Sequence, residues 1–186
     1  MNMETDMPIS HTVIDSPLGE LTLVARDGVL AGVYFPDHSR LPDPATFGPY
    51  VRTGFEAVAE QLGEYFAGDR IEFDLPLAPR GSAFQLRVWN LLREIPYGET
   101  RSYGQLAKQL GNVALAREVG GANARNPLSI IVPCHRVVGA DGRLVGYAGG
   151  LERKRFLLDL EAPATSEQLH IGGRPWNASR TDGGNR

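Results

Sequence analysis

The sequence predicts an α/β domain followed by a mostly helical domain. Residues 11–35 alternate short apolar runs with turn signals, which is typical of a small antiparallel sheet. In the second part of the chain, two Ser-x-x-Gln sequences precede apolar residues at helical spacing. Charge separates the same two parts, because residues 1–86 contain 5 Lys or Arg against 13 Asp or Glu, whereas residues 87–155 contain 11 against 5.

Three strands are expected in the first part, at residues 11–15, 21–25 and 29–35. Ser16-Pro17-Leu18-Gly19 separates the first two strands, and Asp27-Gly28 lies between the second and the third. Asp-Gly between two apolar runs is a strong hairpin signal, because tight hairpin turns require positive φ angles that these residues tolerate. The strands therefore form an antiparallel sheet.

A helix is expected to cover one face of that sheet. Phe55, Val58, Leu62 and Phe66 recur at helical spacing. The stretch 69–80 that follows is polar and contains proline, which is typical of a linker.

Two domains and a tail follow from these boundaries. We place an amino-terminal domain with its linker at residues 1–80 and a second domain at 81–161. Residues 162–186, which contain two Gly-Gly pairs, are expected to be a loosely ordered tail.

Three helices are expected early in the second domain. Ser82 and Gln85 match a capping box that opens the first, which ends before Pro96-Tyr97-Gly98. Ser102 and Gln105 match a second capping box, and a third helix is expected from 114 to 125. The second and third helices are short and separated by Gly111-Asn112, as in a helix-turn-helix.

Small residues and an arginine mark the third of these helices: Ala114, Ala116, Arg117, Gly120, Gly121, Ala122 and Ala124. Glycine in a helix costs about 1 kcal/mol relative to alanine, so two in succession indicate close approach of another group. That group is either DNA, with Arg117 projecting, or a neighbouring helix. The excess of basic residues in this domain is compatible with a polyanion and equally with a solvated surface.

Composition limits the class of protein. The single cysteine excludes an internal disulfide, and four scattered histidines leave no set with zinc spacing, so no metal or cofactor is expected. The acidic amino terminus lacks an apolar stretch, so we expect no membrane association and a cytoplasmic location.

Cys134 is the strongest lead to a chemical function. It follows the apolar run 130–132 and Pro133, and His135 is its next neighbour. A thiol beside a proton acceptor can act as a nucleophile, whereas an isolated cysteine is more often a small buried apolar residue. Because proline ends the run and polar residues follow, we expect Cys134 at the end of a strand, in a reactive setting.

Several motifs together closely resemble the O6-alkylguanine-DNA alkyltransferase family. They are Pro133-Cys134-His135-Arg136-Val137, Asn126-Pro127, Arg117-Glu118-Val119-Gly120-Gly121-Ala122, Gly146-Tyr147-Ala148-Gly149-Gly150-Leu151 and Ile95-Pro96-Tyr97-Gly98-Glu99-Thr100-Arg101-Ser102-Tyr103. The resemblance is continuous from about Phe84 to Glu161. For the amino-terminal domain it implies a ribonuclease H-like α/β fold without nuclease activity.

The resemblance implies repair of DNA by direct reversal of alkylation. An alkyl group would move from guanine O6, with O4-alkylthymine as a further candidate substrate, to Cys134 in one irreversible step. His135 would take the thiol proton through a water, and Glu161 would orient the histidine. Glu161 lies on the last expected helix, whose apolar residues Phe156, Leu157 and Leu160 would turn it inward.

The resemblance also implies that the damaged nucleotide is flipped out of the duplex. Arg117 would fill the vacated stack, and Tyr103 would donate a hydrogen bond to the departing guanine. Asn126 would tie the DNA-binding helices to the active-site loop. Further residues implied at the substrate are Val137, Tyr147 and the main chain of Ala148, and further residues at the DNA are Ser102, Ala116, Gly120 and Arg125. The partner would be double-stranded DNA bound in the minor groove by a monomer that can bind cooperatively.

Two other functions stay open at this point. An alkyltransferase-like lesion sensor would only flag damage, but such relatives lack the reactive cysteine that Cys134 provides. A cysteine hydrolase would use Cys134 and His135, but adjacent residues are hard to align as nucleophile and direct base, and no oxyanion motif is evident.

Overall fold

A three-stranded antiparallel sheet forms the centre of the amino-terminal half. The computed structural model describes residues 8–163, so the expected tail from 164 onward lies outside the described residues. Strands β1 (Ile9–Ile14), β2 (Leu21–Arg26) and β3 (Val29–Tyr34) pair in the order β1-β2-β3. Asp27 and Gly28 have φ angles of 49° and 74°, the positive values that their hairpin turn requires. The predicted sheet is confirmed.

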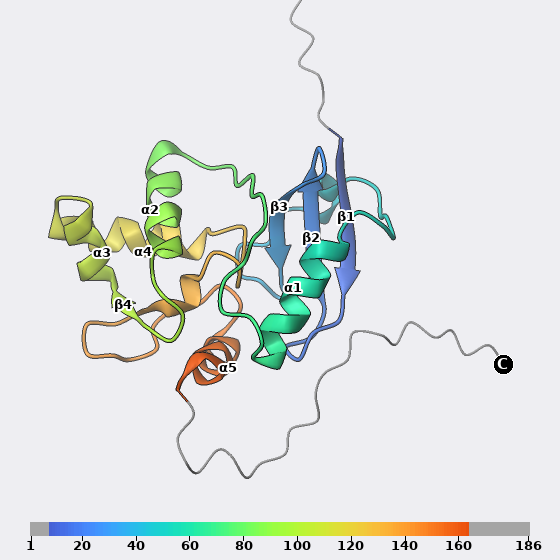
Figure 1. Ribbon diagram of the computed structural model, residues 1–186. Helices are drawn as coiled ribbons and strands as arrows, with labels where there is room; N and C mark the ends of the chain where they lie inside the picture. Colours follow the sequence, from blue (N-terminus) through green and yellow to red (C-terminus); the bar gives the residue numbers. More distant parts are fainter. Residues whose placement is uncertain (1–7, 164–186) are drawn as a thin grey trace, which may run out of the picture.

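Helix α1 (Glu56–Ala67) lies across one face of this sheet, as its apolar spacing predicted (Figure 1). Val58 and Leu62 of α1 pack with Leu21 and Leu23 of the sheet in one buried cluster. On the opposite face, a 3-10 helix (Pro44–Phe47) adds a smaller apolar cluster. The α1 helix is thereby fixed against the sheet along its length.

Four α-helices dominate the second half. They are α2 (Ala83–Arg93), α3 (Tyr103–Gln109), α4 (Ala116–Ala124) and α5 (Leu151–Glu161). The hydroxyls of Ser82 and Ser102 accept hydrogen bonds from the main-chain N–H groups of Gln85 and Gln105, so both capping boxes form. Short strands β4 (Arg101–Ser102) and β5 (Val137–Val138) pair in parallel.

The third helix begins two residues later than the sequence predicted. Residues Val113–Leu115 form a 3-10 turn, and α4 starts at Ala116. The Asn112 side chain accepts a hydrogen bond from the Ala114 N–H, which holds the chain in the tighter turn. The predicted pair of short helices joined by a turn is present in α3 and α4.

Cys134 does not follow a strand, so that expectation is wrong. Residues 130–132 form a buried turn, in which Ile130 has a φ of 72° and the Val132 N–H donates to Leu128 O at 2.9 Å. Cys134 then begins a 3-10 helix, Cys134–Arg136. A run of three apolar residues predicts burial, but it is too short to distinguish a strand from a buried turn.

The segment before this turn pairs with the sheet. The Val33 N–H of β3 donates to Pro127 O at 2.8 Å, and Leu128 forms an isolated parallel bridge with Val33. Residues 77 and 78 of the predicted linker pair in the same way with Leu30. The edge strand β3 thereby holds the chain a few residues before the cysteine.

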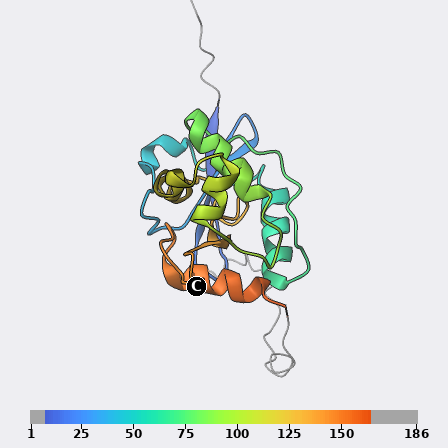
Figure 2. The same ribbon diagram turned by 90° about the vertical axis from the view of Figure 1, so that its left-hand side faces the viewer.

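Helix α5 lies across one end of the molecule, close to the carboxyl end of α1 (Figure 2). Leu157 is fully buried and Glu161 points inward, but Phe156 is 38% exposed. The predicted apolar face of α5 is therefore correct for Leu157 and wrong for Phe156. Among residues 8–163, no helix is both long and apolar enough to cross a membrane.

Candidate active site

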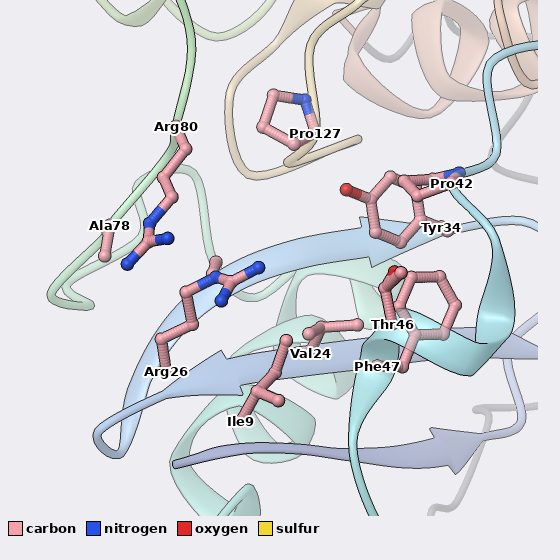
Figure 3. A pocket seen from close by; sticks show the side chains of 11 residues that line it. Ile9, Val24, Arg26, Tyr34, Pro42, Thr46, Phe47, Ala78, Arg80 and Pro127 are labelled. Carbon is pink, nitrogen blue, oxygen red and sulfur yellow. The ribbon is translucent and has the colours of Figure 1, made fainter. Parts of the chain in front are cut away.

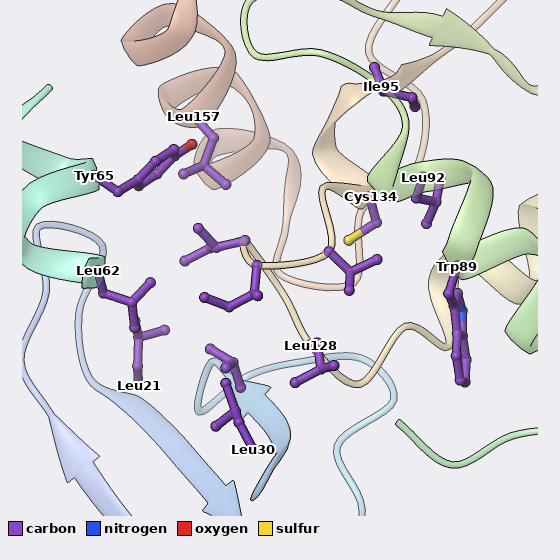
Figure 4. Packing of buried hydrophobic residues seen from close by; sticks show 14 of the residues in the cluster. Leu21, Leu30, Leu62, Tyr65, Trp89, Leu92, Ile95, Leu128, Cys134 and Leu157 are labelled. Atoms are coloured by element: carbon purple, nitrogen blue, oxygen red, sulfur yellow. The ribbon is translucent and has the colours of Figure 1, made fainter. Parts of the chain in front are cut away.

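Cys134 is buried at the junction of the two halves. Its side chain is 3% exposed and lies near Leu92 and Ile95 of the helical half (Figure 4). Burial raises the pKa of the Cys134 thiol, while a hydrogen bond from Asn126 and the charge of Lys154 act in the opposite direction. The resting side chain is therefore a thiol that needs a proton acceptor before it can react.

His135 has one nitrogen free to serve as that acceptor. Its Nε2 lies 2.7 Å from Oε1 of Glu161. An ionised carboxylate only accepts hydrogen bonds, so Nε2 carries the hydrogen and Nδ1 carries the lone pair. Nδ1 is buried and has no hydrogen-bond partner in the described part of the chain. Burial lowers the pKa of His135, so the imidazole is neutral and suited to act as a base.

Glu161 is held by an arginine. Arg136 Nε donates to Oε2 and Nη2 donates to Oε1, both at 2.9 Å, while Nη1 donates to Ile95 O. Glu161 is 3% exposed and Arg136 is 7% exposed. Burial alone would raise the pKa of Glu161, but hydrogen bonds from His135, Arg136 and Tyr65 lower it to about 2. Glu161 is therefore an ionised carboxylate wherever the protein is folded near neutral pH.

Lys154 connects the start and the end of a loop near the cysteine. Its Nζ donates to the main-chain oxygens of Val137, Val145 and Gly146. The side chain is fully buried, and burial lowers the pKa of Lys154 to about 8, while the charge of Cys134 acts in the opposite direction. Lys154 thus closes the loop 138–146 and supplies a positive charge near Cys134.

Sequence reasoning gave no role to Arg136, Lys154 or Tyr65. Arg136 could have been noticed, because an arginine between buried His135 and Val137 must find an anion or carbonyl groups. Lys154 lies one turn before the buried Leu157 on α5 but is one of several basic residues there. Nothing in the sequence distinguishes the Tyr65 hydroxyl from the rings beside it.

Tyr103 lies close to the reactive residues. It begins α3, is half-buried, and donates its hydroxyl to Val145 O at 3.0 Å. Burial, followed by the charge of Cys134, raises the pKa of Tyr103, so the phenol keeps its proton at neutral pH. Gly120 of α4 faces the Tyr103 ring, and a Cβ at Gly120 would lie 3.7 Å from it.

Asn126 bridges the turn before Cys134. Its side-chain amide donates to Val132 O at 2.8 Å and accepts from the Leu128 N–H at 3.0 Å. Both groups belong to the turn 128–132, so one buried side chain holds the turn that follows α4. The neighbouring Asn123 donates to Cys134 O at 3.4 Å.

The remaining predicted substrate residues surround the cysteine on other sides. Val137 is fully buried. The Tyr147 ring packs edge-on against Phe35 of the sheet, and its hydroxyl is buried without a hydrogen-bond partner among residues 8–163. Burial, then the charge of Cys134, raises the pKa of Tyr147. Ala148 is buried, and its carbonyl accepts from the Ser39 N–H at 2.8 Å.

The predicted DNA-contacting residues are exposed or half-buried on or beside α3 and α4. Arg117 and Arg125 are exposed on or just after α4, and Arg125 donates to Gly121 O. Ala116 is half-buried at the start of α4, and Ser102 caps α3. Small residues of α4 also serve helix packing, because the Trp89 indole N–H donates to Ala122 O at 2.9 Å.

A separate cavity of about 100 Å³ lies on the outer face of the sheet (Figure 3). Arg26, Tyr34, Arg80 and Pro127 line it, and the reactive residues do not. In residues 8–163, no group of three His, Cys, Asp or Glu side chains could hold a metal ion.

A buried cysteine backed by a histidine, a carboxylate and an arginine, next to a pair of short helices, defines a thiol-dependent protein with a helix-turn-helix. Two family models match the chain: the ribonuclease-like domain of 6-O-methylguanine DNA methyltransferase at residues 9–79 and its DNA-binding domain at 83–163. The chain belongs to the 6-O-methylguanine DNA methyltransferase family. The resemblance to this family and the expected fold class are therefore confirmed.

Relatives with known names agree with this assignment. The methylated-DNA–protein-cysteine methyltransferase of Mycolicibacterium paratuberculosis is 52% identical over 153 residues, which cover 82% of this chain and 92% of that protein. The protein of the same name from Methanosarcina mazei is 57% identical over 151 residues, covering 81% and 96%. The crystal structure of Mycobacterium tuberculosis OGT in complex with DNA is 49% identical, with a TM-score of 0.76 over 83% of this chain and 96% of that one.

Proposed function

We propose that this protein is a methylated-DNA–protein-cysteine methyltransferase. It removes an alkyl group from O6 of guanine in duplex DNA, with O4-alkylthymine as a second candidate substrate, and keeps the group on Cys134. The observation that carries the proposal is the buried Cys134 next to a neutral His135, whose Nε2 is fixed by Glu161 at 2.7 Å. The names of relatives at about 50% identity support the same reaction.

The chemical step is an in-line displacement. His135 Nδ1 takes the thiol proton through a water, the Sγ–carbon bond forms, and the O6–carbon bond breaks with its electron pair left on guanine. Guanine leaves neutral after gaining one proton, which balances the proton lost by the thiol. Because a thioether is not cleaved again under these conditions, each protein molecule reacts once.

Glu161 and Arg136 make this proton transfer favourable. Glu161 stabilises the imidazolium that forms when His135 takes the proton, and Arg136 keeps the carboxylate ionised and oriented. Lys154 stabilises the thiolate through its nearby positive charge. The buried site therefore contains a partner for each charge that develops.

The pocket and the recognition of the base come from the loop and the helices. Val137, Tyr147 and the Ala148 main chain would contact the alkylated base, and the Tyr103 phenol would donate to the departing guanine. In the structure this phenol donates its hydrogen bond to Val145 O. The bound base would have to replace Val145 O as the acceptor.

DNA binding is assigned to the basic helical domain, here placed at residues 81–161 after an amino-terminal domain at 1–80. We infer minor-groove binding by a monomer, with cooperativity along the duplex. Arg117 would enter the vacated stack while Asn126 holds the turn behind it. Ser102, Ala116, Gly120 and Arg125 would lie along the DNA backbone. A cytoplasmic location is proposed because a single reactive thiol needs a reducing compartment.

The alternatives have less support. A lesion sensor would have no use for a buried cysteine with its own base, and a hydrolase would need an oxyanion site. The test is intact-mass analysis after incubation with a duplex that carries methyl-labelled O6-methylguanine. We expect one methyl group per molecule on Cys134 and none on Cys134→Ala. Repeated turnover, or label on the variant, would exclude this function.

A further inference from the structure

A hydroxyl from the amino-terminal half reaches the carboxylate behind the reactive cysteine. Tyr65 lies in the last turn of α1 and is fully buried, and its hydroxyl donates to Glu161 Oε1 at 2.7 Å. Figure 4 shows this hydroxyl directed toward α5 beside Leu157. The contact joins residues 96 positions apart in the sequence.

The Tyr65 hydroxyl completes the hydrogen bonding of Glu161. Oε1 accepts from Tyr65, His135 Nε2 and Arg136 Nη2, and Oε2 accepts from Arg136 Nε. Oε1 therefore accepts three hydrogen bonds and Oε2 accepts one, so the carboxylate is held mainly through the oxygen that faces His135. Rotation of the carboxylate would separate Oε1 from Tyr65, His135 and Arg136 together.

Tyr65 is itself held in place and stays a donor. Its ring packs against Phe66, Phe73 and Tyr97, with centroids 5.5, 5.3 and 6.3 Å away. Burial, followed by the charge of Glu161, raises the pKa of Tyr65 far above the physiological range. The phenol therefore cannot lose its proton or turn away without moving α1.

We propose that Tyr65 is a positioning residue through which the amino-terminal domain sets the reactivity of Cys134. The hydroxyl donates to Glu161 Oε1, the same oxygen that accepts from His135 Nε2, and so fixes this oxygen toward His135. The role in alkyl transfer rests on the function proposed above, whereas the effect on thiol reactivity does not.

The direction of the effect follows from the orientation of Glu161. Without the hydroxyl, Oε1 loses a donor that fixes it toward His135, so the carboxylate is less well placed to stabilise the imidazolium when His135 takes the thiol proton. Formation of the thiolate then moves to higher pH. The reaction at neutral pH slows, whether the electrophile is an alkylated base or a small reagent.

The test compares Tyr65→Phe with the native protein in two assays over a range of pH. The first is alkylation of Cys134 by iodoacetamide, followed by intact mass, and the second is single-turnover transfer from an O6-methylguanine duplex. We expect the midpoint of the iodoacetamide profile to rise by roughly half to one pH unit, as for loss of one charge-assisted hydrogen bond. At pH 7 we expect both rates to fall about three- to tenfold.

Tyr97→Phe is the matched control. The Tyr97 ring touches Tyr65, but its hydroxyl donates to the main-chain oxygen of Leu160 at 3.3 Å and not to Glu161. We expect this variant to keep the native pH profile. If Tyr65→Phe also keeps the native profile and rates while folded, Tyr65 only fills space and the proposal is wrong.

A fluorinated tyrosine at position 65 keeps the proposal testable if Tyr65→Phe fails to fold. A more acidic phenol donates a stronger hydrogen bond with nearly the same shape, so the midpoint should move to lower pH. An unchanged or raised midpoint would overturn the proposal. If the native protein transfers no methyl group from the duplex, the proposed function fails, and the iodoacetamide profiles still decide the role of Tyr65.

Discussion

Arg136 binds Glu161 through both carboxylate oxygens, with Nε to Oε2 and Nη2 to Oε1 each at 2.9 Å. Both side chains are buried, so neither charge is compensated by solvent. Breaking such a pair leaves an unpaired charge in the interior, which is more costly than the pair itself is stabilising. The arginine next to the His135 base therefore supports both the fold and the proton transfer.

Replacing Arg136 should harm stability and reactivity together. We expect Arg136→Met to lower the free energy of unfolding by about 3–5 kcal/mol, because Glu161 remains buried without its cation. Arg136→Lys should recover only part of this loss, since an ammonium cannot make the planar two-point contact. Urea unfolding monitored by Trp fluorescence measures the first effect, and methyl transfer per molecule measures the second. A variant with native stability would contradict the role of the pair.

Lys154 should limit the rise of the reaction rate at alkaline pH. The pKa of Lys154 is about 8, so its positive charge near Cys134 is lost as pH rises through that value. The thiolate then loses a stabilising charge, and the rate of Cys134 alkylation by iodoacetamide should stop rising near pH 8. Lys154→Met should lack this levelling near pH 8 and react several-fold more slowly at pH 7. Lys108→Met, which changes an exposed lysine on α3, should keep the native profile.

Lys154 should also change the pH dependence of the free energy of unfolding in alkaline solution. The pKa of Lys154 is lowered on folding from 10.5 to about 8, so the unfolded chain holds more protons between these values. The free energy of unfolding should therefore gain a contribution from Lys154 as pH rises from about 8 to 10.5. Native protein and Lys154→Met compared by urea unfolding at pH 7 and 10 isolate this contribution. An equal pH dependence in the two proteins would rule it out.

Features encoded by neighbouring residues were predicted correctly from the sequence. Asp27-Gly28 fixed the hairpin, and Ser82 and Ser102 fixed two helix starts, because each acts on a main chain only a few residues away. The turn at 130–132 was not predicted. Its shape depends on a hydrogen bond from Asn126 and on a positive φ angle at Ile130, and an apolar sequence gives no sign of either.

The contacts of Glu161 could not be predicted in the same way. Its inward position was expected only through the family resemblance. Arg136 and Tyr65 reach it across 25 and 96 residues, and no local pattern reports such a pairing. Apolar periodicity places Tyr65 on the buried face of α1 but treats its ring like that of Phe66. The role of the Tyr65 hydroxyl inside this aromatic cluster can be inferred only once the structure shows that Glu161 is its partner.

Asn126 should contribute more to stability than the nearby Asn123. Asn126→Ala leaves the Leu128 N–H buried without a partner, at about 1–3 kcal/mol, and removes one of the two hydrogen bonds to Val132 O, which keeps the Cys134 N–H. Asn123 makes one long hydrogen bond of 3.4 Å to Cys134 O, and its own oxygen has no partner in the described residues. Asn123→Ala should therefore cost less. Urea unfolding of both variants decides the order, and an equal or reversed order would show that the turn does not depend on Asn126.

Arg117 should matter only when the substrate base lies in a duplex. Its side chain is exposed on α4, whereas Cys134 is buried, and nothing in the reaction of a free base requires it. Extracting a base from a duplex costs a few kcal/mol of stacking and pairing, and a side chain that fills the gap offsets part of that cost. We expect Arg117→Ala to slow repair of an O6-methylguanine duplex by at least about tenfold, as for a loss of roughly 1.4 kcal/mol. Its reaction with free O6-benzylguanine should stay within about twofold of the native rate.

Arg87→Ala, which removes an exposed arginine from α2, serves as the charge-matched control. Equal losses on the duplex and on the free base would show that Arg117 acts on the thiol or the fold and not on the flipped nucleotide.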